Sequence, residues 1–406
     1  MVVGAGFAGL ACADRLLDLG HQVDVMEARD RVGGRVWSQR LVAEDPATLV
    51  ERGAEFVLDG YSALVDVAHR LGLSLVDTGM SYYVREPRGA VSTTPTAMAH
   101  AGRRLAAAAR TAAPSTSLRD LADQVGGDAA ATAACVARIS LSCAYPPELL
   151  SARAALEASA EIEWKPSHRV AGGNHLVALG LAKRLGHRVH TEAVVSAIVT
   201  GTGQVGVATG DADVSADAVV VTVPASLTNT IAFDPPLPTW KLDALSRLGL
   251  GQAAKLHVPL AATAPTSAVL DVDRGYWCWT AHGADGGPQP VVHCFAGAKP
   301  RLDGLAVDDG PSAWVAALSQ LRPDLRLTPQ GAVLTTWNDD PWAAMAYSAF
   351  STQQRPGDAA ALARSIGPVH FAGEHTAGDW AALMEGALRS GIRAADEIHR
   401  KAATSG

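Results

Sequence analysis

The 406-residue sequence predicts an α/β protein built around a parallel sheet, and three features carry this prediction. The chain opens with an apolar segment, a glycine-rich turn and a helical pattern that stops at Gly20. A continuous β-branched run, residues 217–224, is typical of a strand that is buried on both faces of a sheet. Later segments of alternating polarity, such as residues 254–260, predict further strands.

The first turn, Gly4-Ala5-Gly6-Phe7-Ala8-Gly9, has the pattern of a dinucleotide-binding site. Its glycines permit a tight turn and a close approach to a pyrophosphate, which then lies at the N-terminus of the helix. A second predicted strand, residues 22–26, ends at Glu27, 18 residues after Gly9, where a carboxylate can accept hydrogen bonds from ribose hydroxyls. We therefore predict a Rossmann-like unit. Its first strand is either short or continues upstream of Met1.

The next residues distinguish between the dinucleotides. Ala28 is followed by Arg29, and the pair Gly33-Gly34 precedes Arg35. This predicts a second close backbone approach to phosphate, with cationic donors beside it, which a simple NAD fold does not need. The segment EARDRVGGRV after GxGxxG resembles the signature of the flavin amine oxidase family, which includes monoamine, polyamine and putrescine oxidases. The resemblance implies FAD as the cofactor.

The resemblance extends over most of the chain and is weakest between about 60 and 165. Residues 51–57 resemble the segment that passes along the isoalloxazine, and residues 337–347 and 369–387 resemble the two closing flavin segments. It implies the following cofactor-binding residues: Gly4, Ala5, Gly6, Phe7, Ala8, Gly9, Glu27, Ala28, Arg29, Gly33, Gly34, Arg35, Gly53, Ala54, Glu55, Phe56, Val194, Trp337, Trp342, Gly373, Glu374, Leu383, Met384 and Ala387.

The order of these motifs implies two interleaved domains. A Rossmann-like FAD-binding domain is expected at residues 1–58, 170–224 and 335–406, and an α+β substrate-binding domain at 59–169 and 225–334. The first insertion is alanine-rich and helical, so we expect it to form walls of the substrate cavity. The second insertion reads as a mixed sheet with strands at 254–260, 275–281 and 290–296.

Lys255 and Tyr347 are the expected catalytic residues. Spacing alone favours a solvent-facing strand lysine, whereas the resemblance aligns Lys255 with the lysine that holds a water against flavin N5. Tyr347 matches one of the two tyrosines that flank the substrate nitrogen, and the other position falls on Leu383. A tyrosine face attracts an amine, so the missing ring predicts a bulkier or more apolar substrate than a simple arylalkylamine. The expected substrate pocket contains Leu383, Trp342, His168 and Trp380.

The residue before Tyr347 is Ala346, where monoamine oxidases have the cysteine that is bonded to the flavin. We therefore expect FAD to be non-covalent. The resemblance implies an amine oxidase that passes a hydride equivalent from the amine α-carbon to flavin N5. The resulting imine is hydrolysed to a carbonyl and an amine or ammonia, and oxygen reoxidises the flavin to give hydrogen peroxide. The expected partners are therefore a small amine and O2.

Other functions on the same scaffold stay open. One is an amino-acid oxidase, whose substrate α-carboxylate would need a cationic partner, with Arg85 and His168 as candidates. Another is a desaturase or tailoring oxidase. A flavin-binding protein without turnover is less favoured, because both Lys255 and Tyr347 are present.

Composition excludes several further classes. The net charge of −7 gives no basic field for nucleic acid. The five cysteines lack CxxC spacing, His187 and His190 are expected on opposite faces, and Asp339-Asp340 reads as a solvated loop, so no metal is expected. No run of about 18 apolar residues, signal peptide or tail anchor is found. We expect a cytoplasmic protein without a membrane partner, and a homodimer stays open.

Overall fold

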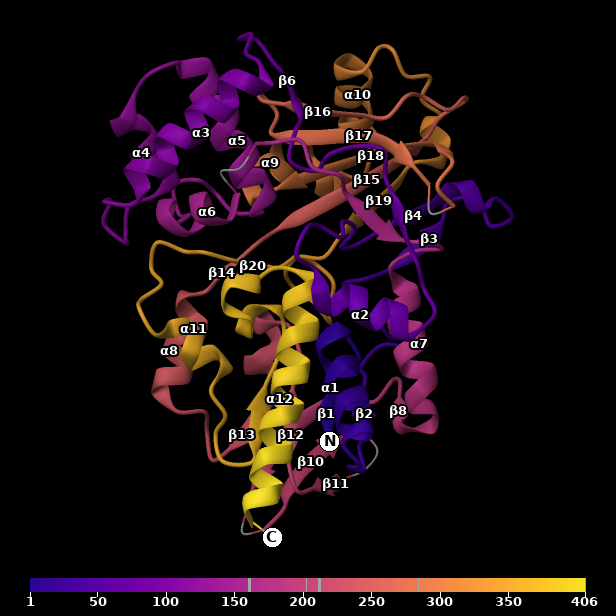
Figure 1. The fold of residues 1–406 in the computed structure, drawn as a ribbon, viewed down its shortest axis with the longest axis vertical. Coiled ribbons are helices and arrows are strands. Elements are labelled where there is room, and N and C mark those ends of the chain that lie inside the picture. Colours follow the sequence, from indigo (N-terminus) through magenta and orange to yellow (C-terminus); the bar gives the residue numbers. More distant parts are fainter. Residues whose placement is uncertain (160–161, 202, 211–212, 284, 406) are drawn as a thin grey trace.

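The chain folds around two large sheets, which Figure 1 shows in the lower and upper parts of the molecule. The computed structural model describes residues 1–159, 162–201, 203–210, 213–283 and 285–405. Both termini lie in the lower part (Figure 1). The fold is α/β, as the sequence predicts.

The lower sheet has five parallel strands in the order β21-β12-β1-β2-β8. Val2 and Val220 face a core formed with helices α1, α7 and α12, whereas Val3, Val219 and Val221 face a second core. The β-branched run is therefore buried on both faces, as predicted. The strands are β1 (Val2–Val3), β2 (Val25–Met26), β8 (Val189–His190), β12 (Val219–Val221) and β21 (Val369–Phe371).

The second core is closed by a four-stranded sheet in the order β11-β10-β9-β13. Its strands are β9 (Val195–Thr200), β10 (Val205–Thr209), β11 (Asp213–Ala216) and β13 (Ala232–Asp234). The helices of the lower part are α1 (Phe7–Asp18), α2 (Ser62–Arg70), α7 (His175–Leu185), α8 (Thr239–Arg247), α11 (Asp358–Ala363) and α12 (Met384–Ser405).

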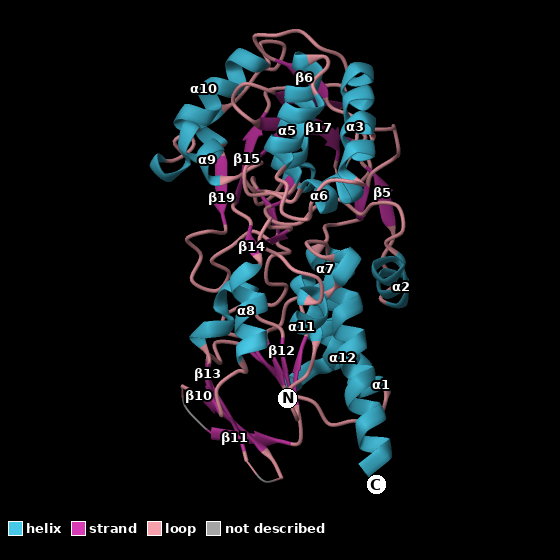
Figure 2. Ribbon diagram, turned by 90° about the vertical axis from the view of Figure 1, so that its left-hand side faces the viewer, coloured by secondary structure: helices cyan, strands magenta, loops and turns pink. Residues whose placement is uncertain are grey.

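The upper sheet has six strands in the order β19-β15-β18-β17-β16-β6. On one face, Leu256 and Cys278 pack with residues of α9 and α10; on the other, Trp277 and Trp279 pack with residues of α3 and α5. Figure 2 shows α9 and α10 on the opposite side of this sheet from α3. The strands are β6 (Glu86–Arg88), β15 (Ala253–Pro259), β16 (Ser267–Asp271), β17 (Tyr276–His282), β18 (Pro288–Gly297) and β19 (Val333–Thr336). The helices are α3 (Pro95–Ala109), α4 (Leu118–Val125), α5 (Ala129–Ser142), α6 (Ala152–Ser159), α9 (Lys299–Gly304) and α10 (Ser312–Leu321).

Three short strand pairs complete the described fold. They are β3 (Ser38–Arg40) with β4 (Leu49–Glu51), β5 (Leu75–Asp77) with β7 (His168–Val170), and β14 (Gly249–Leu250) with β20 (Ser348–Ala349).

Strand lengths and segment boundaries depart from the sequence expectation. The second strand is expected at 22–26 but contains only Val25–Met26. The expected substrate segment begins at residue 225, yet β13 pairs with β9, and α8 packs on α11. Tyr61, Leu64 and Val67 also belong to the core of the lower sheet. We therefore propose that these two transitions lie near residues 250 and 72, because a segment belongs with the core in which its apolar side chains are buried.

Candidate active site

A cavity of about 330 Å³ lies between the lower and upper sheets. Gly4 and Thr222 border it from the lower part, and Lys255 and Trp277 border it from the upper part. Of the predicted cofactor-binding residues, all but Ala5 and Gly9 line this cavity. The sequence motifs are thus brought to one place, although they are spread over almost the whole chain.

The glycine-rich turn precedes α1 and fits a pyrophosphate. A Cβ atom on Gly9 would lie 1.9 Å from the Gly4 carbonyl oxygen, so this packing requires glycine. A Cβ atom on Gly6 would meet nothing within 4 Å, and Gly6 borders the cavity. Among the described residues, no side chain caps the N-terminus of α1, so its first N–H groups are free for an anionic ligand. Ala5 and Gly9 belong to this turn but do not line the cavity.

Glu27 lies immediately after β2 and is buried. Its Oε2 accepts a hydrogen bond from the Ala5 N–H at 2.6 Å, and its Oε1 accepts one from the Arg29 N–H at 3.0 Å. Burial raises the pKa of Glu27, and these two backbone donors partly oppose the shift. An ionised carboxylate can accept about four hydrogen bonds. Two acceptor positions therefore remain for ribose hydroxyls.

Arg29 is fixed by an acid from the far end of the chain. Its guanidinium donates to both carboxylate oxygens of Asp340, at 2.9 and 2.6 Å. Asp340 also accepts a hydrogen bond from the Trp342 N–H at 2.8 Å, and Trp342 and Trp337 both border the cavity. The expectation of a solvated loop is wrong for Asp340, because this two-point ion pair holds the loop against Arg29 beside the cavity.

Arg35 and Glu374 form a second polar junction beside the cavity. Arg35 Nη1 lies 3.1 Å from Glu374 Oε1 and donates to the Ala346 carbonyl oxygen at 2.8 Å. Burial raises the pKa of Glu374, but Arg35, His375 and hydrogen bonds from Ser348 and Ala382 outweigh burial and leave the pKa lowered. An ionised Glu374 therefore joins three segments that border the cavity.

Lys255 is buried on β15 rather than exposed to solvent, which contradicts the interpretation from spacing alone. Its Nζ donates to Glu55 Oε2 at 2.6 Å, to the Glu51 carbonyl oxygen at 2.6 Å and to the Gly53 carbonyl oxygen at 3.1 Å. An ammonium group has three protons. All three are therefore directed at the segment expected to run along the isoalloxazine.

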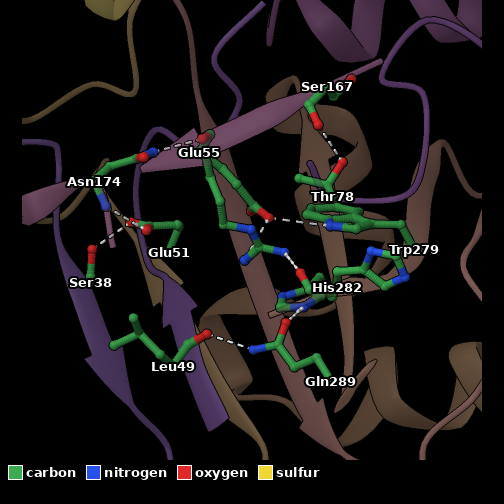
Figure 3. Close-up of polar contacts among 12 residues, drawn as sticks. Ser38, Leu49, Glu51, Glu55, Thr78, Ser167, Asn174, Trp279, His282 and Gln289 are labelled. Carbon is green, nitrogen blue, oxygen red and sulfur yellow. Dashed lines mark hydrogen bonds and ion pairs between the residues drawn. The ribbon is translucent and has the colours of Figure 1, made fainter. Parts of the chain in front are cut away.

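Glu55 is the centre of a buried polar network, part of which Figure 3 shows. Besides Lys255, it accepts a hydrogen bond from Trp279 Nε1 at 3.3 Å and lies 3.7 Å from Arg169 Nη1. Burial raises the pKa of Glu55, but Lys255 and Arg169 outweigh burial, and the pKa is lowered. The carboxylate therefore stays charged and holds Lys255 in place.

Tyr347 borders the cavity, as Lys255 does. Its phenol donates to the Ser142 carbonyl oxygen at 2.8 Å, which orients the ring from α5. Leu383, the position of the expected second tyrosine, also borders the cavity. Of the residues lining the cavity in the described chain, none is cysteine or histidine. All five cysteines are free and lie elsewhere.

Two expected pocket residues lie outside the cavity. His168 is in β7, where it pairs with Asp77 of β5. Trp380 packs edge-on against Tyr61, with Arg389 over its ring at 4.5 Å. Trp380 lies within residues 369–387, which resemble a closing flavin segment, yet its ring packs against the core of the lower sheet. Neither lines the pocket, so both pocket assignments are dropped.

Other pocket residues were missed from the sequence. Trp277 and Trp279 line the cavity as a stacked pair with ring centroids 4.1 Å apart. Their two-residue spacing, which places them on one face of a strand, was the available signal. Tyr82 and Ser142 also border the cavity, and no local motif marks them.

Two features are absent from the described residues. No group of three or more His, Cys, Asp or Glu side chains is arranged to hold a metal ion there. Within the same ranges, no helix has both the length and the apolar character that crossing a bilayer requires.

Comparison with known proteins identifies relatives over the full length of the chain. A family model described as flavin containing amine oxidoreductase matches residues 7–399. The putative flavin-containing monoamine oxidase AofH of Mycobacterium tuberculosis is 28% identical over 452 residues, which cover 98% of this chain and 96% of that protein. Polyamine oxidase 4 of Oryza sativa subsp. japonica is 27% identical over 460 residues, covering 99% of this chain and 88% of the relative.

Solved structures share the fold at lower identity. Putrescine oxidase bound to putrescine superposes with a TM-score of 0.82 at 22% identity, covering 98% of each chain. Cyclohexylamine oxidase from Brevibacterium oxydans IH-35A gives a TM-score of 0.82 at 20% identity, covering 99% of this chain and 98% of that one.

Proposed function

The chain belongs to the family of flavin-containing amine oxidoreductases, and from this premise we propose that it oxidises a small amine with non-covalently bound FAD and with O2 as electron acceptor. Membership makes the chain an amine-oxidising flavoenzyme. The relatives' own substrates differ, since one is named for polyamines and another is bound to putrescine. The chemistry of this cavity must therefore indicate the substrate.

The observation that carries the proposal is the meeting of two sets of residues at one cavity. Gly6, Glu27 and Arg29 fit the pyrophosphate and ribose, and Lys255 and Tyr347 border the same cavity. Bound FAD would supply the acceptor for the hydride equivalent and the electrons that pass to oxygen. The protein's part is to orient the amine and to exclude water from the site, for which the stacked rings of Trp277 and Trp279 are suited.

We propose separate roles for the two catalytic residues. Tyr347, held by Ser142, presents its ring to the substrate nitrogen. Lys255 places a positive charge beside residues 53–55 and supports the reaction with oxygen. A water at Lys255 would replace the Gly53 carbonyl oxygen, because that contact, at 3.1 Å, is the longest of its three.

Non-covalent FAD is supported by the lining of the cavity. The described lining residues include no thiol or imidazole, which are nucleophiles suited to a covalent flavin link, and Ala346 offers no side-chain nucleophile. Acid precipitation of the purified protein should release the yellow chromophore into the supernatant. A yellow pellet would contradict this part of the proposal.

The reaction is tested by mixing the holoenzyme with a panel of amines without oxygen. Bleaching of the flavin, followed by recovery of the absorbance and peroxide release when oxygen is admitted, is the expected result. A flavoprotein that no amine bleaches would instead be a binding protein without turnover. The same proposal places the protein in the cytoplasm, which is supported by its five free cysteines.

A further inference from the structure

A buried arginine that has no carboxylate partner among the described residues borders the cavity. Arg85 is 1% exposed and lines the cavity together with Tyr82 and Trp277. Among the described residues it forms no ion pair, and its Nη1 is shielded from solvent without a hydrogen-bond partner. A buried charge normally has a counter-charge or a full set of hydrogen bonds. Arg85 therefore lacks a partner, and a bound ligand could supply it.

Its other contacts hold the guanidinium in a fixed place. Nε donates to the Tyr82 carbonyl oxygen at 3.3 Å, and Nη2 donates to Ser142 Oγ at 3.1 Å. The guanidinium carbon lies 3.9 Å from the centroid of the Trp277 ring and 4.9 Å from that of Tyr82. Aromatic faces stabilise a cation but do not neutralise it. This environment is consistent with the pKa of Arg85, which burial lowers to about 9.

Arg85 is also tied to the expected catalytic tyrosine. Ser142, which receives the Arg85 hydrogen bond on its hydroxyl, receives the Tyr347 hydrogen bond on its carbonyl oxygen. The cation and the ring that faces the substrate nitrogen are thus anchored on one residue. One small ligand could therefore place an anionic group at Arg85 and its amine at Tyr347.

We propose that Arg85 is a carboxylate subsite and that the substrate is an amine that also carries a carboxylate, such as an amino acid. This inference rests on the proposed amine oxidation and specifies its substrate class. A planar guanidinium matches the geometry of a carboxylate, and a dry, aromatic surrounding strengthens the pair. In the proposal this position belongs to the substrate and not to FAD, because Arg85 contacts Tyr82, Ser142 and Trp277, which are not among the residues expected to bind the cofactor.

The test compares each amino acid with the amine formed by removing only its carboxylate. Suitable pairs are ornithine with putrescine and phenylalanine with 2-phenylethylamine, assayed with the holoenzyme by peroxide release. We expect the amino acid of at least one pair to have a kcat/KM at least 100-fold above that of its amine. Equal or higher kcat/KM for the amine in every pair would overturn the subsite and leave amine oxidation standing. If no compound of either kind bleaches the flavin, the proposed oxidation itself fails.

Variants separate a carboxylate contact from a structural role. In Arg85→Met, kcat/KM should fall at least 30-fold more for the preferred amino acid than for its amine, mostly through KM, and Arg85→Lys should recover part of the loss. Arg103→Met, which changes an exposed arginine, is the matched control and should leave both values unchanged. An equal fall for both compounds in Arg85→Met would overturn the subsite.

A binding measurement does not depend on turnover. Benzoate should perturb the flavin absorbance of the wild-type holoenzyme, with a dissociation constant at least tenfold larger in Arg85→Lys. Because Arg85→Lys keeps the positive charge, it can be used for this measurement if Arg85→Met does not retain FAD. The same dissociation constant in both proteins would contradict the assignment of Arg85.

Discussion

Lys255 and Glu55 form a buried ion pair that joins the upper sheet to the segment expected along the flavin, with Nζ 2.6 Å from Oε2. Lys255 also donates to two backbone carbonyls of the same segment. The lysine therefore fixes the shape of residues 51–55 as well as adding charge there. Its replacement should change both the stability of the protein and its chemistry.

Lys255→Met should lower the free energy of unfolding of the holoenzyme by about 3 kcal/mol, because Glu55 would keep only Arg169 and Trp279 as partners. It should also slow reoxidation of the reduced flavin at least tenfold. Urea unfolding measures the first effect and stopped-flow mixing with oxygen the second. Lys299→Met, in an exposed pair with Asp303, is the control and should change neither. Unchanged reoxidation in Lys255→Met would remove the lysine from the oxygen reaction.

Gly6 and Gly9 should respond differently to alanine. In Gly9→Ala the new Cβ atom would meet the Gly4 carbonyl oxygen, so the apoprotein should lose about 1–3 kcal/mol of stability. In Gly6→Ala the Cβ atom meets no protein atom within 4 Å, so apoprotein stability should be unchanged, while the dissociation constant for FAD rises about tenfold or more. Apoprotein unfolding and FAD titration distinguish the two. Full FAD affinity in Gly6→Ala would show that the pyrophosphate does not lie over this glycine.

The sequence predicts the parts of the site that are determined locally. The turn at Gly4 to Gly9 and the carboxylate of Glu27 lie within one strand–turn–helix–strand unit, where a few residues set the backbone geometry. The alternation that puts Leu256 and Val258 on one face is likewise visible in four consecutive residues, and both pack in the core with α9 and α10.

Contacts between distant segments could not be predicted in this way. Asp340 pairs with Arg29 across 311 residues, and Arg85 meets Ser142 across 57, so no local pattern reports either contact. His168 shows the opposite error, since it is expected in the substrate pocket but lies in a strand beside Asp77. Whether a side chain reaches the cavity depends on how the separate cores pack against each other. The distance of a residue from a motif in the sequence does not determine that packing.

Glu27→Gln should raise the dissociation constant for FAD about 10- to 100-fold. The side-chain amide can place an N–H group against the N–H of Ala5 or Arg29, and it removes charge-assisted hydrogen bonds worth about 1.5–3 kcal/mol each. Fluorescence titration of the apoprotein with FAD measures the change. Glu44→Gln, at an exposed position, is the matched control. Parental affinity in Glu27→Gln would mean that the ribose is held elsewhere.

Glu397 should make the folding stability of the protein depend on pH in the acid range. It lies 2.8 Å from Arg393 and 3.2 Å from His370, and it thereby ties α12 to β21. Burial opposes its ionisation, but His370 and Arg393 prevail and lower its pKa from 4.5 to about 2. A carboxyl group whose pKa is lower in the folded state stabilises the fold at pH values above 4.5, and this contribution disappears as the pH falls toward 2.

Glu397→Gln should therefore be less stable than the parent by about 1–2 kcal/mol at pH 7, a value reduced from the full shift because the side chain is 26% exposed. The difference should shrink by more than half between about pH 5 and pH 3, because in this range the unfolded chain binds a proton at Glu397 while the folded protein still holds the carboxylate ionised. Urea unfolding of both proteins across this range measures it, with Glu44→Gln as control. A difference that stays constant with pH would mean that the loss comes from packing of the side chain and not from its ionised carboxylate.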